Sequence, residues 1–258
     1  MGRASRKRKE QRQTAVNNPS PTTQHENSAL LAHAALPHKV VFSEEIEPQP
    51  IEANTKIYRF MNSEKFADDF AIGKIRLSTL KKCRAYEDPL QGDSEEAIHR
   101  YNSGRWTGSG IEAKARLARM GVFVGGATDV FLSNNTVTSR IEDAYILCAT
   151  DKFDPSSFKE NFGDYCIEIS QPKKFFEVLT NSIRKTHLLA EEKWGLISYA
   201  ERFTQGLNAE PGRIGFVKPM RYSPQREVRF LWRPKFSTNL EFFNLDVPEC
   251  ADYCKRII

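Results

Sequence analysis

The sequence lacks any apolar run approaching the roughly 18 to 20 residues that a membrane-spanning helix needs. Its basic N-terminus is not followed by an apolar segment, so it does not have the pattern of a secretory signal. Cysteine is scarce, because only five residues, an odd number, are scattered over 258 positions. That pattern is typical of a reducing compartment rather than of a disulfide framework. We therefore expect a cytoplasmic protein with no membrane partner.

Motifs for several common chemistries are also missing. The sequence has no Gly-rich phosphate loop, no GxGxxG after a strand and no HExxH zinc motif. The pair Cys250-x-x-x-Cys254 is not followed by a second Cys or His pair, which argues against a zinc site. A polar loop offers carboxylates that a divalent metal would accept, although such loops are usually only solvated. Its carboxylates are Asp88, Asp93, Glu95 and Glu96. We predict no metal site.

Positive charge is concentrated at one end of the chain. Residues 1–13 contain six Lys or Arg side chains and one Glu. Since the whole chain has 38 basic and 33 acidic residues, the remainder carries 32 of each sign. Net charge therefore does not imply a large nucleic-acid-binding face on the folded part, and a local basic patch is the alternative that stays open. The basic cluster itself is a candidate contact for nucleic acid, or else a solubilising end.

The first 50 residues are predicted to be a disordered, flexible tail and linker. Residues 16–27 are polar, contain proline and lack apolar periodicity, and residues 44–50 form an acidic segment broken by proline. Residues 28–35 have the composition of a short helix that Pro37 would end. We expect residues 51–258 to form a single domain, since 40% hydrophobic residues and 17 Phe suffice for a core.

The predicted domain is α+β, with a mixed, mostly antiparallel sheet and flanking helices. Apolar residues recur at helical spacing in 64–72, 111–120 and 172–194. Alternating or continuous apolar runs predict strands. These runs are 56–60, 74–80, 122–124, 129–132, 144–149, 165–169, 195–199, 214–218, 227–232 and 240–245.

Four short segments combine polar side chains with predicted strands and loops. Arg59 lies in an otherwise apolar strand, and Ser78 and Thr79 end the next one. The other two are the loop 86–93 and the segment 222–229, which enters a strand at a glutamate. Each feature alone is more often structural, since Ser and Thr are common in turns. Their combination on successive strands favours a functional site.

Five short motifs are spread over residues 56–232. They resemble those of a family of uncharacterised bacterial domains that are frequent near mobile and phage-defence genes. The family pattern reads lYrf, g-I-x-ls, DP-x-x-x-D, G-x-x-C-x-E and K-x-x-x-Y-x-x-E/Q-x-E-x-R. In this sequence the motifs are Ile57–Phe60, Gly73–Ser78, Glu87–Asp93, Gly163–Glu168 and Lys218–Arg229.

A second resemblance concerns chemistry. Arg59, Ser78-Thr79 and Gln225-x-Glu227 are similar to the Arg, Ser-Thr-Ser and Gln/Glu-x-Glu residues of ADP-ribosyltransferases. That resemblance implies a split β core that clamps NAD as a substrate. The sequence departs from the pattern at Leu80, which leaves the Ser-Thr-Ser motif incomplete, and in the short spacing between Arg59 and Ser78.

The resemblance also implies roles for individual residues. Glu227 would hold the ribose 2′-hydroxyl and stabilise the oxocarbenium-like transition state, while Gln225 would orient an acceptor. The planar guanidinium of Arg59 would grip the pyrophosphate. The remaining predicted cofactor contacts are Ser78 and Thr79 at the ribose and Tyr86 or Phe60 on the nicotinamide.

These observations predict an NAD-dependent ADP-ribosyltransferase-like enzyme, a toxin or phage-defence effector that modifies protein or nucleic acid. A non-catalytic binding module of a defence or regulatory complex, with a nucleic-acid-binding basic tail, is the alternative. NAD should raise the melting temperature of the enzyme and leave that of the module unchanged.

Overall fold

The structure is a computed structural model that describes residues 46–52, 54–86, 92–126, 129–236 and 239–258. The basic cluster 1–13 and the predicted helix 28–35 lie outside the described residues. Residues just before the expected boundary at 51 contact the domain, because Gln49 forms a β-bridge with Leu196 and Glu47 pairs with Lys193. No helix among the described residues has the length and apolarity to cross a membrane.

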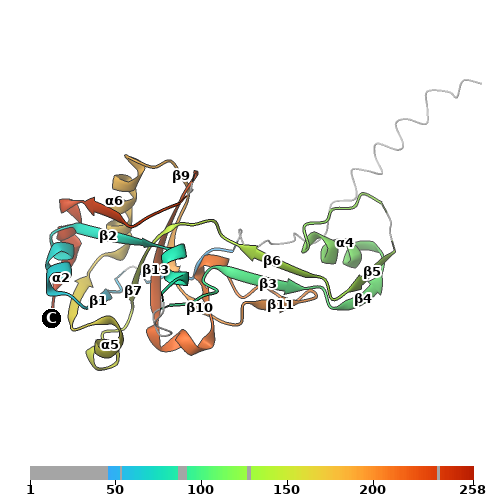
Figure 1. The fold of residues 1–258 in the computed structure, drawn as a ribbon, viewed down its shortest axis with the longest axis horizontal. Helices are drawn as coiled ribbons and strands as arrows, with labels where there is room; N and C mark the ends of the chain where they lie inside the picture. The colour runs from blue at the N-terminus through green and yellow to red at the C-terminus, as the bar shows by residue number, and fades with distance from the viewer. Residues whose placement is uncertain (1–45, 53, 87–91, 127–128, 237–238) are drawn as a thin grey trace, which may run out of the picture. The chain divides into compact units, whose positions relative to one another are not determined.

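The main sheet has eight strands, and every pairing within it is antiparallel. Its order is β14-β2-β7-β1-β8-β15, and β13 lies between β7 and β9. This arrangement confirms the predicted α+β class (Figure 1). The strands are β1 (Ile57–Met61), β2 (Lys74–Thr79), β7 (Tyr145–Thr150), β8 (Tyr165–Ile169), β9 (Leu189–Leu196), β13 (Glu227–Pro234), β14 (Phe243–Asp246) and β15 (Cys254–Arg256).

The sheet is split along one edge of β7. The other edge of β7 pairs with β13 over its whole length, from Tyr145 opposite Trp232 to Thr150 opposite Glu227. On the split edge, β2 pairs with β7 only at Tyr145 and Ile146, and β1 pairs with it only at Thr150. The middle of β7 therefore has no strand partner on this side, and β1 and β2 separate there.

Aromatic side chains fill the core between the sheet and helix α6 (Pro172–Arg184). Phe176 stacks on Trp232 with ring centres 5.3 Å apart, and Phe175 meets Phe230 at 5.8 Å. The Trp232 indole N–H donates to Thr180 Oγ1 at 2.7 Å, so its polar atom is satisfied in the core. Burying each such side chain stabilises the fold by about 1.5 to 3 kcal/mol.

Helix α2 (Glu64–Ala71) lies between β1 and β2 in the sequence and buries Ala67 and Phe70. The helix ends at Ala71, two residues before Gly73, whose positive φ of 86° favours glycine. A side chain at this position would also collide with the carbonyl of Val247. Strand β2 follows the helix and pairs with β14 in the sheet.

Smaller elements complete the described chain. Strand β3 (Ile98–Asn102) pairs in antiparallel with β6 (Thr136–Arg140) and in parallel with β11 (Phe203–Gln205), which makes the fold mixed as expected. The others are α3 (Leu80–Arg84), β4 (Arg105–Gly108), α4 (Gly110–Ala118), β5 (Val130–Ser133), α5 (Pro155–Phe162), β10 (Ser198–Tyr199), η3 (Ile214–Phe216), β12 (Val217–Lys218), η4 (Met220–Gln225) and η5 (Pro248–Tyr253).

Three predicted elements differ from the structure. The helix expected over 172–194 ends at Arg184, because the chain that follows pairs with β13 as strand β9. Residues 122–124 are not a strand, and Phe123 is 75% exposed there. Residues 214–218 form a 3₁₀ turn followed by the two-residue strand β12. In each case the apolar residues of the segment do not by themselves indicate which other part of the fold they contact.

Candidate functional site

A cavity of about 810 Å³ opens at the split in the sheet. Its lining comes from β1, β2, β7, α2, α5, the end of η4 and the segment around β14. Five of the six predicted site residues line it, although they lie far apart in the sequence. These five are Arg59, Ser78, Tyr86, Gln225 and Glu227. The fold thus brings the predicted residues together in one place.

Thr79, the sixth of these residues, is not among the described residues that line the cavity. Its side chain is fully buried, and its Oγ1 accepts a hydrogen bond from the Lys82 amide at 3.2 Å. Thr79 is therefore the N-cap of helix α3, a position where threonine is favoured. This geometry gives the residue a structural role in place of the predicted cofactor contact.

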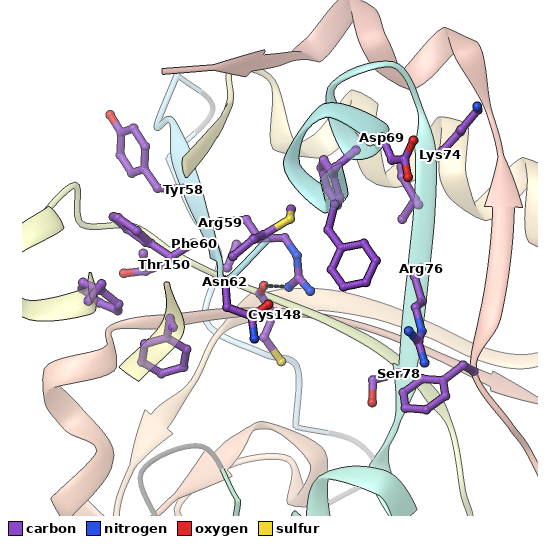
Figure 2. A pocket seen from close by; sticks show the side chains of 18 of the residues that line it. Tyr58, Arg59, Phe60, Asn62, Asp69, Lys74, Arg76, Ser78, Cys148 and Thr150 are labelled. Atoms are coloured by element: carbon purple, nitrogen blue, oxygen red, sulfur yellow. Dashed lines mark hydrogen bonds between the residues drawn. The ribbon is translucent and has the colours of Figure 1, made fainter. Parts of the chain in front are cut away.

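Arg59 extends from β1 across the split to the unpaired middle of β7. Its guanidinium donates to the carbonyl of Cys148 and lies 5.8 Å from the centre of the Phe70 ring (Figure 2). The Nε atom is enclosed and has no hydrogen-bond partner among the described residues. Burial lowers the pKa of Arg59, since no carboxylate among those residues forms an ion pair with it. Among the described residues, this guanidinium in the cavity wall has no carboxylate partner.

Arg76 is a second cation at the cavity, and it was not predicted. Its guanidinium carbon lies 3.8 Å from the centre of the Phe242 ring, a cation–π arrangement. Figure 2 shows Arg76 and Ser78 on β2, across from Arg59 on β1. The signal was present in the sequence, because residues two apart on a strand share a face. Because Ser78 is a predicted site residue, Arg76 is expected to lie on the same face of β2 as the site.

Aromatic rings form much of the remaining wall. Phe60 and Phe158 are stacked with ring centres 5.0 Å apart, and Phe162 follows at 5.5 Å from Phe158. Tyr86 and Phe242 also line the cavity and are 55% and 43% exposed. A mostly apolar wall with a few placed polar groups is the usual form of a small-molecule site. Rings and cations together suit a ligand that carries both a planar ring and negative charge.

Glu227 is a buried residue at the start of β13. Only 4% of the residue is exposed. Its carboxylate accepts hydrogen bonds from Lys218 Nζ at 2.5 Å and from Arg229 Nε at 2.8 Å. Burial raises the pKa of this carboxyl, but Arg229 and Lys218 outweigh it and lower the pKa to about 2. The carboxylate is therefore ionised at neutral pH.

Gln225 reaches the cavity as the last residue of the 3₁₀ turn η4 and not from a strand. Arg226 then adopts a left-handed conformation with φ 44° and ψ 49°, after which β13 begins. The Gln225 Oε1 accepts from Lys218 Nζ at 3.1 Å. One lysine thus contacts both predicted catalytic side chains.

The acidic loop forms ion pairs with arginines. Asp93 accepts from Arg202 at 2.6 Å, and Glu96 accepts from Arg229 at 2.8 Å, both well buried. Glu95 pairs with Arg100 near the surface. Asp88 lies outside the described residues. Within the described residues, no three His, Cys, Asp or Glu side chains are grouped to hold a metal ion.

The chain was compared with models of protein families, with curated proteins and with solved structures, and none of them matches it. The two resemblances stated for the sequence stay predictions. The geometry of the cavity is the basis on which a function is assigned.

Proposed function

We propose that the cavity binds NAD and that the protein is an ADP-ribosyltransferase-like enzyme. The observation that carries this proposal is Arg59, a guanidinium in the cavity wall with an enclosed Nε that lacks a described partner. Leaving such a polar group unsatisfied costs about 1 to 3 kcal/mol, and more for a charged group. A pyrophosphate in the cavity would supply a counter-charge to this guanidinium.

The other lining groups suit the rest of a dinucleotide. Arg76 on β2 offers a second cation near the first, and the Phe242 ring beneath it offers an apolar face. The stacked rings Phe60 and Phe158 provide a surface for an aromatic base or nicotinamide. Ser78 offers a hydroxyl for the ribose. We propose each of these contacts, and together they suit a ligand that carries both an aromatic ring and phosphate.

Glu227 supplies the charge that the reaction needs. When the bond between ribose and nicotinamide breaks, the bonding electron pair leaves with nicotinamide, and positive charge develops on the ribose. An ionised carboxylate stabilises that charge, and Lys218 and Arg229 hold the Glu227 carboxylate in place through Oε2 and Oε1. The acceptor, water or a group on protein or nucleic acid, then attacks the ribose and loses a proton.

The first test measures NAD affinity by calorimetry and by the shift in melting temperature. We expect Arg59→Met to weaken NAD binding at least tenfold, because it removes a charge-assisted contact that is worth about 1.5 to 3 kcal/mol. Arg256→Met is the matched control, since it removes an arginine from the exposed pair with Glu64 and Asp68. Equal affinity in all three proteins would contradict the proposal.

The second test measures NAD consumption. Glu227→Gln should lower turnover by orders of magnitude while NAD affinity changes little. This variant also removes a buried charge, so turnover has to be compared at a temperature where both proteins are folded. Full activity in Glu227→Gln would exclude the transferase assignment.

One observation favours the alternative of a non-catalytic binding module. Two cations already neutralise Glu227, which weakens its field at the ribose. A module predicts NAD or nucleotide binding that depends on Arg59, with no consumption of NAD by the wild-type protein. The two tests together therefore separate enzyme from module.

A further inference from the structure

Lys218 contacts the cavity residues Gln225 and Glu227 but is not among the described residues that line the cavity. It belongs to the short strand β12, and 5% of the residue is exposed. Its Nζ donates to Glu227 Oε2 at 2.5 Å and to Gln225 Oε1 at 3.1 Å. The ring of Tyr222 lies 5.2 Å from the same atom. One ammonium group therefore joins the end of η4 to the start of β13, on either side of the left-handed Arg226.

The remaining charges of this buried cluster serve the scaffold. Arg229 contacts both oxygens of Glu96, at 2.8 and 3.2 Å, and the carbonyl of Gly215 at 2.7 Å, besides Glu227. Arg202 binds Asp93 and the carbonyl of Val217. The cluster holds three carboxylates and three cations that neutralise one another. Among the described cations of this cluster, Lys218 is the member that contacts both Gln225 and Glu227.

We propose that Lys218 is a positioning residue for the site, which fixes the side chains of Gln225 and Glu227 at the cavity wall. This inference rests on the proposed function. A free glutamine side chain has about 1.5 to 2 kcal/mol of rotamer entropy, which its contact with the lysine offsets. A displacement of a reacting group by about 1 Å costs up to 100-fold in rate, so the loss of this contact should affect turnover more than binding.

Lys218 also keeps Glu227 ionised. The groups that face the carboxylate are Lys218 from β12, Arg229 from β13, Glu96, and Cys148 from β7. The hydroxyl of Tyr199, from β10, accepts a hydrogen bond from the Glu227 backbone amide at 2.7 Å. Without Lys218, burial and Glu96 oppose the single cation that remains. The carboxyl should then take up a proton at a higher pH, and the acid limb of activity should move up with it.

The test compares Lys218→Met, Lys218→Arg and the wild type. Arg213→Met is the control, because Arg213 is also a buried cation paired with a glutamate, Glu191 at 2.6 Å, and does not line the cavity. We expect Lys218→Met to lower kcat for NAD hydrolysis about 10- to 100-fold with a change in Kd below about threefold. Its acid limb should move up by about one pH unit or more. Lys218→Arg should restore most of the activity.

A second readout does not depend on activity. Side-chain carboxyl NMR of ¹³C-labelled glutamate follows the titration of Glu227, which should occur at higher pH in Lys218→Met than in the wild type and Arg213→Met. If the wild type consumes no NAD, the proposed function fails, and this titration alone decides whether Lys218 controls Glu227. Should Lys218→Met not fold, Lys218→Gln takes its place, since it retains a donor without charge.

Two outcomes would overturn the proposal. One is an unchanged titration of Glu227 together with wild-type kcat in the Lys218 variants. The other is an equal loss of kcat in Arg213→Met, which would show that lost stability, rather than lost position, lowers turnover.

Discussion

Arg229 is a buried arginine and Arg59 a partly buried one, on two strands of the same sheet, and their surroundings differ. Arg229 is 1% exposed, and its guanidinium contacts two carboxylates and a carbonyl. Arg59 contacts the carbonyl of Cys148, and its Nε has no described partner. The carboxylates hold the pKa of Arg229 above its ordinary value, whereas burial lowers that of Arg59. The first residue is satisfied by the fold, and the second has a donor without a described partner.

The largest expected effect is on the satisfied arginine. Arg229→Met leaves Glu96 and Glu227 buried with fewer cations, and removing one partner of a buried ion pair typically destabilises a protein by about 3 to 5 kcal/mol. Chemical denaturation should show this loss in the free energy of unfolding. A loss below about 1 kcal/mol would break the comparison, because Arg229 would then not hold the fold together.

Acid should act through the same cluster. The pKa of Glu227 is lowered from the ordinary 4.5 to about 2, and that of Glu96 is lowered as well. The unfolded chain therefore binds more protons below pH 4.5, so this stabilisation is complete above about pH 4.5 and is lost as pH falls toward 2. Melting temperatures measured between pH 6 and 2 should fall steeply in the wild type and less steeply in Arg229→Met. Parallel curves would contradict this origin of the acid sensitivity.

Arg59→Met should have a small effect on stability. The substitution loses one hydrogen bond but also removes a desolvated charge, and apolar replacements of buried charges are often neutral or stabilising. We expect the free energy of unfolding to change by about 1 kcal/mol or less, in the same denaturation assay. A loss as large as that of Arg229→Met would show that Arg59 is a scaffold residue.

The smallest expected effect concerns the ring beneath Arg76. Phe242→Ala removes a half-exposed cation–π contact worth about 0.5 to 1 kcal/mol, so NAD affinity should fall about two- to fivefold. Phe236→Ala is a control, because Phe236 is 78% exposed and does not line the cavity. Equal effects in both variants would remove Phe242 from the site.

The resemblance to ADP-ribosyltransferases predicts Arg59, Ser78, Gln225 and Glu227 as site residues, and the fold places all four at one cavity. The pattern in β2 and β13 placed Ser78 and Glu227 on defined faces, and both faces meet the cavity. Alternation does not distinguish a face that meets water from one that meets buried ions. The burial of Glu227 depends on Lys218 and on Glu96, which is remote in sequence, so no local pattern contained it.

The polar strands were missed for a related reason. Strand β6 reads TVTSR and is largely exposed, so it has too few apolar residues for a periodic signal. Most of strand β9 lies within the helix predicted over 172–194, because its pairing with β13 outweighs the weak helical pattern beyond Arg184. The apolar run 144–149 predicts β7 at nearly its observed position, whereas α6 begins at the predicted residue 172 but ends at Arg184.

The central place of β13 has a consequence for the order of assembly during synthesis. Its two neighbours, β7 and β9, both precede it in the chain. Until residues 227–234 have been made, β7 and β9 have no strand between them, and Glu96 has no arginine at position 229 to pair with. Contacts between segments so distant in sequence form slowly. The nascent chain therefore has no complete cavity wall, and the sheet and the site arise together as β13 is inserted.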